Sequence, residues 1–346
     1  MPSTDLDQVL DQTRGVWEEL RGARLFVTGG TGFFGSWLLE SMVHAELALG
    51  LGLRAVVLTR DPESFRARRP ALAASTLLSF TAGDIRDFSF PAGNFSHVIH
   101  AATDTSAALN AGRADEMRDV IVSGMKRVLD FTSTCGAQRL LLASSGAVYG
   151  RQRPETTHLA EDDDALFTTS GPSSAYAEGK REAERLCREA AGRRGLQPVI
   201  ARGFAFLGPH LPLDAQYAAG NFVRDALRGG PIQVCGDGSP YRSYLYASDL
   251  AAWLWTILVR GASGRAYNVG SERRVTVAEL AQTVAAVLSP GVDVRIAKLP
   301  APNVAPEQYV PSTRRAREEL GLREIVSLEE AIRRTGAWAS AASKSV

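Results

Sequence analysis

The chain has 346 residues, of which 45% are hydrophobic and 22% charged, as is ordinary for a globular protein with a sizeable core. Its net charge of +1 offers no basic excess to neutralise phosphates, which argues against broad nucleic-acid binding. It lacks an apolar run of about 18 residues that could span a membrane, its start is too polar for a signal peptide, and its three cysteines lie too far apart for a metal site, so we expect a cytoplasmic protein without metal.

Residues 1–22 are predicted to form an N-terminal helical extension. Apolar side chains recur there at roughly helical spacing: Leu6, Val9, Leu10, Trp17 and Leu20. We expect this helix to pack on the main domain. A helix that binds a partner is the alternative interpretation.

From residue 24 onward, short apolar strands alternate with helices. Strands are predicted at 24–28, 54–59, 77–81, 97–100, 139–143 and 198–201, and helices at 36–47, 115–133 and 176–194. Such alternation indicates right-handed crossovers and a parallel sheet covered on both faces. The predicted fold class is therefore α/β, a Rossmann-like doubly wound parallel sheet.

After about residue 205 the elements become shorter and glycine and proline more frequent. Elements are predicted at 220–228 (helix), 231–235 (strand), 243–260 (strand, then helix), 276–288 (helix) and 313–339 (helix). We expect residues 23–204, with parts of the C-terminal half, to form a dinucleotide-binding domain. Residues 205–340 would form a smaller, mixed lobe that binds the substrate.

The first predicted strand runs into the sequence GGTGFFG (29–35) and then directly into a helix. Glycines at positions 29, 32 and 35 leave no Cβ atom between the backbone N–H groups and a ligand. A pyrophosphate could then approach the positive end of the helix dipole. The strand before the loop and the helix after it make this a specific signal for a dinucleotide.

The end of the second predicted strand bears on which dinucleotide binds. A carboxylate there would hold the adenosine ribose of NAD, whereas an arginine can accept the 2′-phosphate of NADP. Here Thr59 stands at that position, Arg60 follows, and Asp61 comes two residues late. The pattern favours NADP, but the loop could bend Asp61 back to the ribose, so both cofactors remain open.

Tyr176 and Lys180 are predicted to lie one turn apart on the same face of a helix. A phenol needs its pKa lowered by about three units to act as a base near neutral pH, and a nearby ammonium could contribute to this. Ser144 and Ser145 end the fifth predicted strand, at the sheet edge where ligands bind in such folds. A serine hydroxyl there could contact a substrate oxygen beside the tyrosine.

Six motifs together resemble the extended short-chain dehydrogenase/reductase family, in its nucleotide-sugar epimerase and dehydratase branch. The motifs are GGTGFFG, GDIRD (83–87), HAAT (100–103), SSGAVYG (144–150), YAEGK (176–180) and GDGSPYRSYLYASDLA (236–251). The resemblance covers about residues 23–340. It implies an enzyme that binds NAD or NADP and a nucleotide-sugar substrate, and a homodimer formed through the helices at 115–133 and 176–194.

The resemblance also implies roles for individual residues. The catalytic set would be Ser145, Tyr176 and Lys180. The cofactor would contact Gly29, Thr31, Gly32, Phe33, Phe34, Gly35, Thr59, Arg60, Asp84, Ile85, Ala101, Ala102, Thr103, Tyr176 and Lys180, with Asp84 and Ile85 beside the adenine. The substrate would contact Ser144, Ser145, Asn221 and Arg242, and the Arg242 guanidinium would clamp its diphosphate.

The sequence departs from the family pattern at several positions. Sugar 4,6-dehydratases carry an Asp-Glu pair where this chain has Gly146 and Ala147, so dehydration is not expected. Ala205 replaces a common asparagine and Ser312 a common aspartate, which bears on the substrate and not on the fold.

The leading hypothesis is therefore an NAD(P)-dependent epimerase of a nucleotide-diphosphate sugar, acting through reversible hydride transfer at C4. A ketoreductase of a 4-keto nucleotide sugar, using NADPH, is one alternative. An oxidative decarboxylase of a nucleotide sugar is another. A dinucleotide-sensing protein without catalysis is a fourth, which the intact Ser145, Tyr176 and Lys180 disfavour.

Overall fold

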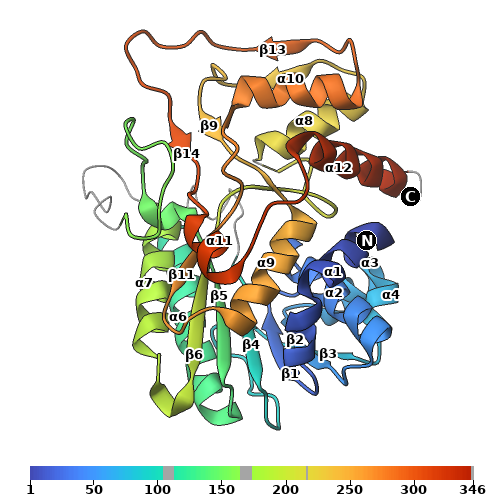
Figure 1. Cartoon of the computed structure of the whole chain (residues 1–346), viewed down its shortest axis with the longest axis vertical. Coiled ribbons are helices and arrows are strands. Elements are labelled where there is room, and N and C mark those ends of the chain that lie inside the picture. The colour runs from blue at the N-terminus through green and yellow to red at the C-terminus, as the bar shows by residue number, and fades with distance from the viewer. Residues whose placement is uncertain (104–112, 164–173, 216, 344–346) are drawn as a thin grey trace.

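A computed structural model describes residues 1–103, 113–163, 174–215 and 217–343, and a seven-stranded parallel sheet forms its centre (Figure 1). All six predicted strands are present: β1 (Arg24–Thr28), β2 (Arg54–Thr59), β3 (Leu78–Ala82), β4 (His97–His100), β5 (Arg139–Ser145) and β6 (Gln197–Gly203). The strand order is β11-β6-β5-β4-β1-β2-β3. The strand order reverses between β1 and β4, and the predicted doubly wound α/β class is confirmed.

The seventh strand, β11 (Ala266–Val269), was not predicted. It pairs in parallel with β6, with Ala266 opposite Ile200, and so extends the sheet with a segment from the C-terminal half. Its four residues, AYNV, are too few to show a periodicity of their own. Only its pairing with the longer β6 makes it a strand.

Helices cover both faces of the sheet. One face carries α2 (Phe33–Leu49) and α9 (Ala247–Arg260), with α1 (Ser3–Glu19) packed outside them. The other face carries α6 (Ala114–Cys135) and α7 (Ala175–Glu189), which lie side by side in Figure 1. Apolar residues alternate between the two cores along each strand, because successive side chains point to opposite faces.

Helix α1 confirms the helix predicted near the N-terminus, and its apolar side packs within the chain. The ring of Trp17 lies 4.7 Å from that of Trp255 on α9. The fully buried Asp5 accepts hydrogen bonds from the Tyr246 hydroxyl at 2.7 Å and from Arg334 at 2.8 Å. A buried carboxylate with these partners ties α1 to the segment just before α9 and to the C-terminal helix.

The remaining elements form a second core, here called the small lobe, at the top of Figure 1. Its helices are α8 (Ala218–Leu227), α10 (Val277–Leu288) and α12 (Leu328–Ser343). Its strands pair as β12-β9-β14, β10-β7 and β13-β8. Their bounds are β7 (Phe206–Leu207), β8 (Ile232–Val234), β9 (Tyr241–Arg242), β10 (Leu245–Tyr246), β12 (Val275–Thr276), β13 (Val294–Ile296) and β14 (Gln308–Tyr309).

The prediction of one helical stretch over 313–339 was wrong. Two helices occupy it, α11 (Arg314–Leu320) and α12, and residues 321–327 separate them. Gly321 has φ 70° and ends α11 in the left-handed conformation, which glycine adopts without steric cost. Short helices α3 (Pro62–Arg68), α4 (Pro70–Ala73), η1 (Gly146–Tyr149) and η3 (Arg193–Gly195) complete the described chain.

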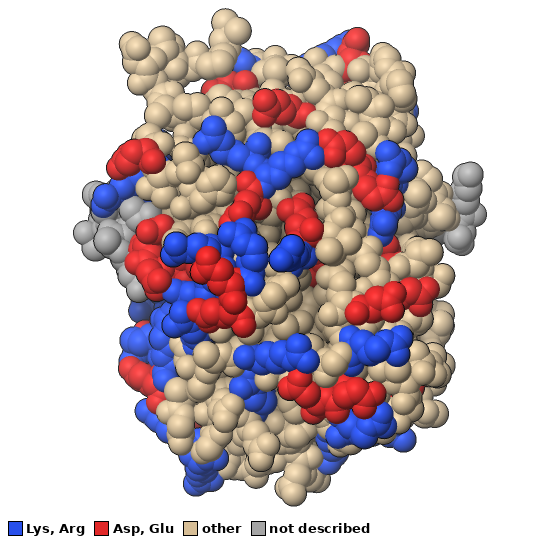
Figure 2. All heavy atoms as spheres, in the orientation of Figure 1, with Lys and Arg blue, Asp and Glu red and all other residues tan. Residues whose placement is uncertain are grey.

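Acidic and basic side chains are interspersed on the face drawn in Figure 2, in keeping with the net charge of +1. Within the described residues, no helix combines the length and the apolar composition that crossing a membrane would need.

Candidate active site

The glycine-rich loop between β1 and α2 has the geometry of a phosphate cradle. Gly29 adopts φ 72°, and a Cβ atom there would lie 2.4 Å from the backbone of Ala101, so no larger residue fits. A Cβ at Gly35 would lie 2.2 Å from the carbonyl oxygen of Gly29. Gly32 precedes α2 and no side chain caps the helix, so its first N–H groups are available to an anion. The loop therefore fits the pyrophosphate of a dinucleotide.

The residues around this loop define its walls. The ring of Phe34 packs edge-on against Phe206 at 5.1 Å, and Phe33 packs near both rings, so these two residues offer a ligand their backbone N–H groups. Thr31 is half-buried in the loop. The segment Ala101, Ala102 and Thr103 follows β4 and is held to Thr28 of β1 by hydrogen bonds of 3.1 and 3.3 Å from its backbone N–H groups.

The carboxyl end of β2 presents an arginine, as the sequence indicated. The Asp61 carboxylate accepts a hydrogen bond from the backbone N–H of Ser64 at 2.9 Å and caps α3. Bending Asp61 back toward a ribose would break this cap. A hydrogen bond from Arg86 lowers the pKa of Asp84, and the positive charge of Arg60 adds to the effect. Arg60 therefore lies close to the predicted adenine site.

Asp84 and Ile85 differ in what they can offer a ligand. Asp84 is already paired with the Arg86 guanidinium at 2.8 Å. Ile85 is buried in the core between the sheet and α6, where it packs beside Gly124. Their position at the end of β3 places both near the cradle, and their contacts with the cofactor remain predictions.

Ser145, Tyr176 and Lys180 come together at the carboxyl edge of the sheet. Ser145 ends β5, and its Oγ accepts a hydrogen bond from the backbone N–H of Ala147 at 3.2 Å. The Ser174 side chain caps α7, which presents Tyr176 and Lys180 one turn apart. The Ser145 hydroxyl lowers the pKa of Tyr176 against the effect of burial, so the two side chains are neighbours, and Lys180 Nζ lies 5.8 Å from the centre of the Tyr176 ring.

The electrostatics of this group differ from the expectation. Lys180 is 3% exposed, and its ammonium donates to Thr103 Oγ1 and to the Ala143 carbonyl oxygen, both at 2.7 Å. Burial lowers the pKa of Lys180 to about 8. Burial also raises the pKa of Tyr176 to about 12, although Ser145 opposes the rise. The expected lowering of the tyrosine pKa is therefore not a property of the protein alone, because desolvation outweighs the opposing effect of Ser145.

The lowered pKa of Lys180 predicts how the free energy of unfolding depends on pH. Between about pH 8 and about pH 10 an unfolded lysine holds its proton while folded Lys180 loses it, so the unfolded state binds more protons. The free energy of unfolding should therefore gain a contribution that rises with pH in this window. We expect Lys180→Met to lack that contribution in urea unfolding across the window. The exposed Lys126→Met is the control and should follow the wild type; equal slopes in all three proteins would contradict the assignment.

A second phenol, which the sequence did not predict, lies beside this group of residues. The Tyr309 hydroxyl on β14 lies 2.6 Å from the point where a Cβ at Gly146 would stand. Its ring stacks on Phe204 with 4.7 Å between ring centres, and burial raises the pKa of Tyr309 while Ser145 opposes the rise, so the two side chains are neighbours. No local pattern marks Tyr309, because the pairing of β14 with β9 brings it to the site. Any side chain at position 146 would collide with Tyr309 and Phe204.

Arg242 lies on β9, directly opposite Tyr309 on β14. Its guanidinium donates to the Tyr241 carbonyl oxygen at 2.8 Å and to the Glu307 carboxylate at 2.9 Å. Burial raises the pKa of Tyr309, and the charge of Arg242 opposes that rise, so the guanidinium lies near the catalytic group. Its partner Glu307 is 53% exposed, so this pair costs little to separate.

Two residues predicted to bind substrate have other partners. Ser144 is buried, and its hydroxyl donates to Glu184 at 2.6 Å. Asn221 lies on α8, where its side-chain oxygen accepts a hydrogen bond from Arg224 at 3.1 Å. Ser144 thus also supports Glu184 behind the site, and the contacts of Ser144 and Asn221 with the substrate stay predictions.

A buried ion pair lies behind Tyr176 and Lys180 on α7. Glu184 follows Lys180 by one turn of α7 and is 2% exposed, and the fully buried Arg202 donates to it at 2.8 and 3.0 Å. Arg202 also donates to the Tyr149 hydroxyl at 2.8 Å. The charge of Glu184 opposes the effect of burial on the pKa of Lys180. The spacing of four residues after Lys180 was the available sequence signal for Glu184.

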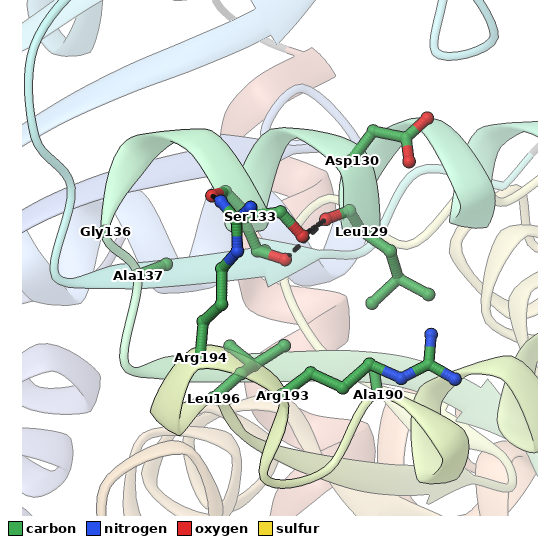
Figure 3. A pocket seen from close by; sticks show the side chains of 10 residues that line it. Leu129, Asp130, Ser133, Gly136, Ala137, Ala190, Arg193, Arg194 and Leu196 are labelled. Carbon is green, nitrogen blue, oxygen red and sulfur yellow. Dashed lines mark hydrogen bonds between the residues drawn. The ribbon is translucent and has the colours of Figure 1, made fainter.

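A small hollow of about 150 Å³ lies at the other end of α7 (Figure 3). It is lined by residues at the ends of α6 and α7 and after them, including Ser133, Ala190 and Arg194. Arg194 donates a hydrogen bond to the Ser133 carbonyl oxygen across it. Because Tyr176 lies in the first turn of α7, this hollow is distant from the catalytic group.

Comparison with known proteins decides the family. The model of the NAD dependent epimerase/dehydratase family matches residues 25–270. The chain belongs to this family. A nicotinamide dinucleotide is accordingly its cofactor, in agreement with the geometry of the glycine cradle.

Among curated relatives, UDP-glucuronic acid decarboxylase 6 of Arabidopsis thaliana is 28% identical over 314 residues, covering 89% of this chain and 86% of the relative. UDP-N-acetyl-alpha-D-glucosaminuronate decarboxylase of Bacillus cytotoxicus is 27% identical over 327 residues, covering 91% and 97%. This family member is thus similar to enzymes named for acting on nucleotide sugars.

Two solved structures share the fold over almost their whole length. Epimerase Mth375 of Methanothermobacter thermautotrophicus has a TM-score of 0.77 at 22% identity, covering 99% of this chain and 98% of that one. The dTDP-glucose 4,6-dehydratase DesIV of Streptomyces venezuelae, solved with NAD bound, has a TM-score of 0.77 at 24% identity, covering 92% and 97%. At these identities the likeness establishes the fold.

Proposed function

We propose that this family member transfers hydride reversibly between a carbon of a nucleoside-diphosphate sugar and its nicotinamide cofactor. The observation that carries the proposal is the meeting of Ser145, Tyr176 and Lys180 beside the glycine cradle, at one edge of the sheet. Thr103 links the three side chains to the glycine cradle. It follows the end of β4, which faces the cradle, and it accepts a hydrogen bond from Lys180.

Each catalytic side chain has a task that its surroundings permit. Tyr176 exchanges a proton with the sugar hydroxyl, and Ser145 hydrogen-bonds the same sugar oxygen. Lys180, fixed by Thr103 and the Ala143 carbonyl oxygen, holds a positive charge beside the phenol. When bound, the oxidised nicotinamide ring accepts hydride and adds positive charge that favours the phenolate.

We propose epimerisation at C4 as the net reaction. Epimerisation needs only this group and room for the oxidised sugar to turn. Water elimination needs an acid and a base besides, and neither Gly146 nor Ala147 has an ionisable side chain. Tyr309 and Phe204 leave no room for an acid at position 146.

Two other reactions have specific support. Oxidative decarboxylation is supported by the relatives, two of which are named as decarboxylases of nucleotide-linked uronic acids. Reduction of a 4-keto sugar by NADPH is supported by Arg60 near the adenine site and by the use of Asp61 as a helix cap. All three reactions use the same three catalytic residues.

Product analysis distinguishes epimerisation, decarboxylation and reduction. The protein is incubated with UDP-glucose or UDP-glucuronic acid and either NAD⁺ or NADPH, and products are followed by mass spectrometry and NMR. An epimer keeps the substrate mass, decarboxylation releases CO₂, and reduction of an added 4-keto sugar consumes NADPH. Loss of water would contradict the argument from Gly146, and no reaction with any nucleotide sugar would overturn the proposal.

The bound dinucleotide is an independent measurement. Denaturing the purified protein and identifying any released cofactor distinguishes a redox-neutral cycle from a net reduction. Tightly held NAD⁺ supports epimerisation, because the cofactor is regenerated within each turnover. Weakly held NADPH supports reduction.

We expect Arg242→Ala to raise KM for the nucleotide sugar by roughly 30- to 150-fold, the equivalent of about 2 to 3 kcal/mol for a lost charged hydrogen bond. Arg242 can exchange its exposed partner Glu307 for the substrate diphosphate. Arg242→Lys should recover part of the loss, since lysine cannot make two parallel bonds.

Steady-state kinetics and cofactor titration check this prediction. Arg295→Ala is the matched control, because Arg295 lies on β13 of the small lobe and is 64% exposed. Cofactor affinity should stay unchanged in all three variants. An unchanged KM in Arg242→Ala would show that Arg242 does not hold the substrate.

We also propose that two copies assemble through α6 and α7, which lie side by side on one face of the sheet (Figure 1). Light scattering of the purified protein tests this assembly.

A further inference from the structure

Helix α7 binds two consecutive residues at the end of β5, just before Ser145. The Lys180 ammonium donates to the Ala143 carbonyl oxygen at 2.7 Å. One helical turn later, the Glu184 carboxylate accepts a hydrogen bond of 2.6 Å from the Ser144 hydroxyl. Residues four apart on a helix share one face, so the same face of α7 makes both contacts with β5. Together the two contacts fix the position of α7 along the strand.

The Glu184 carboxylate also binds the neighbouring strand. Arg202 of β6 lies opposite Ser144 in the parallel register, and its guanidinium donates to Glu184 at 2.8 and 3.0 Å. One carboxylate thus joins α7 to the carboxyl ends of two adjacent strands. All three side chains are buried, so water competes little for these hydrogen bonds.

A third contact of α7 lies on the other side of Ser145. Arg181 donates to the Val148 carbonyl oxygen at 2.8 Å, in the short helix η1 that directly follows Ser145. The Ser145 hydroxyl itself accepts a hydrogen bond from the backbone N–H of Ala147 at 3.2 Å. Residues 143–148 are therefore attached to α7 both before and after Ser145.

Tyr176 lies on the same helix, one turn before Lys180. The Lys180 ammonium is 5.8 Å from the centre of the Tyr176 ring. A displacement of α7 along β5 would therefore move Tyr176 relative to Ser145. Such a displacement matters, because an error of about 1 Å in the position of a reacting group can cost about 100-fold in rate.

We propose that Ser144 and Glu184 are positioning residues, whose hydrogen bond sets the position of α7 along β5 and so places Tyr176 beside Ser145. The inference rests on the proposed function and deepens it, because it assigns a role to two buried residues behind the reacting group. The single hydrogen of the Ser144 hydroxyl goes to Glu184, so Ser144 cannot donate to the substrate at the same time.

Ser144→Ala tests the inference, because it removes this hydrogen bond and leaves the pair of Glu184 and Arg202 in place. We expect kcat to fall about 5- to 30-fold, with KM for the nucleotide sugar and cofactor affinity unchanged, since the loss affects alignment and not binding. A raised KM would overturn the positioning role and assign Ser144 a contact with the substrate.

Arg188→Gln is the matched control. Arg188 donates to the same Glu184 carboxylate at 2.8 Å, but it is 43% exposed and lies on α7 itself. Its hydrogen bond therefore does not connect the helix to β5. We expect Arg188→Gln to keep the wild-type kcat and KM.

A double-mutant cycle with Tyr176→Phe separates positioning from a general loss of structure. If Ser144 acts by placing Tyr176, adding Ser144→Ala to Tyr176→Phe should change the remaining kcat by less than about twofold. An equal fall in kcat in the presence and absence of the Tyr176 hydroxyl would make the hydrogen bond between Ser144 and Glu184 merely structural.

Amide hydrogen exchange followed by mass spectrometry is a measurement that needs no turnover. Ser144→Ala should raise exchange in the peptides that cover 143–148 and 175–184, whereas Arg188→Gln should not. This outcome does not depend on whether a nucleotide sugar reacts. Absence of any reaction in the wild type would therefore count against the proposed function, whereas wild-type kcat or unchanged exchange in Ser144→Ala would overturn the inference.

Discussion

Tyr176→Phe should lower kcat by about 10²- to 10⁴-fold, the range that general acid–base catalysis contributes. The substitution keeps the ring and removes the hydroxyl that lies beside Ser145. Because the ring remains, the fold and the contact with the Lys180 ammonium should survive. Measuring kcat together with cofactor affinity and thermal unfolding distinguishes a loss of proton transfer from a loss of cofactor binding or of stability.

The control for this experiment is Tyr241→Phe, which removes a phenol hydroxyl outside the site. Cofactor affinity should be equal in both variants and the wild type, since the cradle is formed by the glycine loop. If Tyr176→Phe keeps most of the wild-type kcat, Tyr176 does not carry the proton. Another group near Ser145 would then have to do so, and Tyr309 is a second phenol beside Ser145.

The predictable parts of the fold and the site are those that depend only on residues close together in the sequence. The loop at 29–35 stands between a strand and a helix in the sequence itself, and the pair Tyr176 and Lys180 needs only helical spacing to meet. Strands β1, β2, β4, β5 and β6 are mostly buried on both faces and therefore read as apolar runs.

The parts that were missed depend on pairing between distant segments. Strand β11 is defined by β6, and β14 by β9, and neither has a periodicity of its own. Tyr309 meets Ser145 only because these pairings fold the small lobe onto the sheet edge. The raised pKa of Tyr176 was unforeseen for a related reason: burial depends on all the elements packed around a residue, whereas spacing in the sequence reports only the lysine.

The ion pair behind the site provides the largest expected effect on stability. Glu184→Ala should lower the free energy of unfolding by about 3 to 5 kcal/mol, because it leaves the fully buried Arg202 without its main partner. The Ser144 hydroxyl would lose its acceptor as well. Chemical denaturation of the purified variant measures the loss.

Glu182 on the same helix supplies the matched control, since it is 31% exposed and pairs with Arg185 at the surface. Glu182→Ala should cost about 0 to 1 kcal/mol. The double variant Glu184→Leu with Arg202→Met replaces both charges by apolar groups and should recover much of the loss, because a buried pair is costly mainly when broken. The recovered protein would still lack the carboxylate beside Lys180, so its kcat should stay below that of the wild type although its stability returns. A Glu184→Ala protein as stable as Glu182→Ala would show that Arg202 finds another partner, and the ion pair would then not be what holds α7 against the sheet.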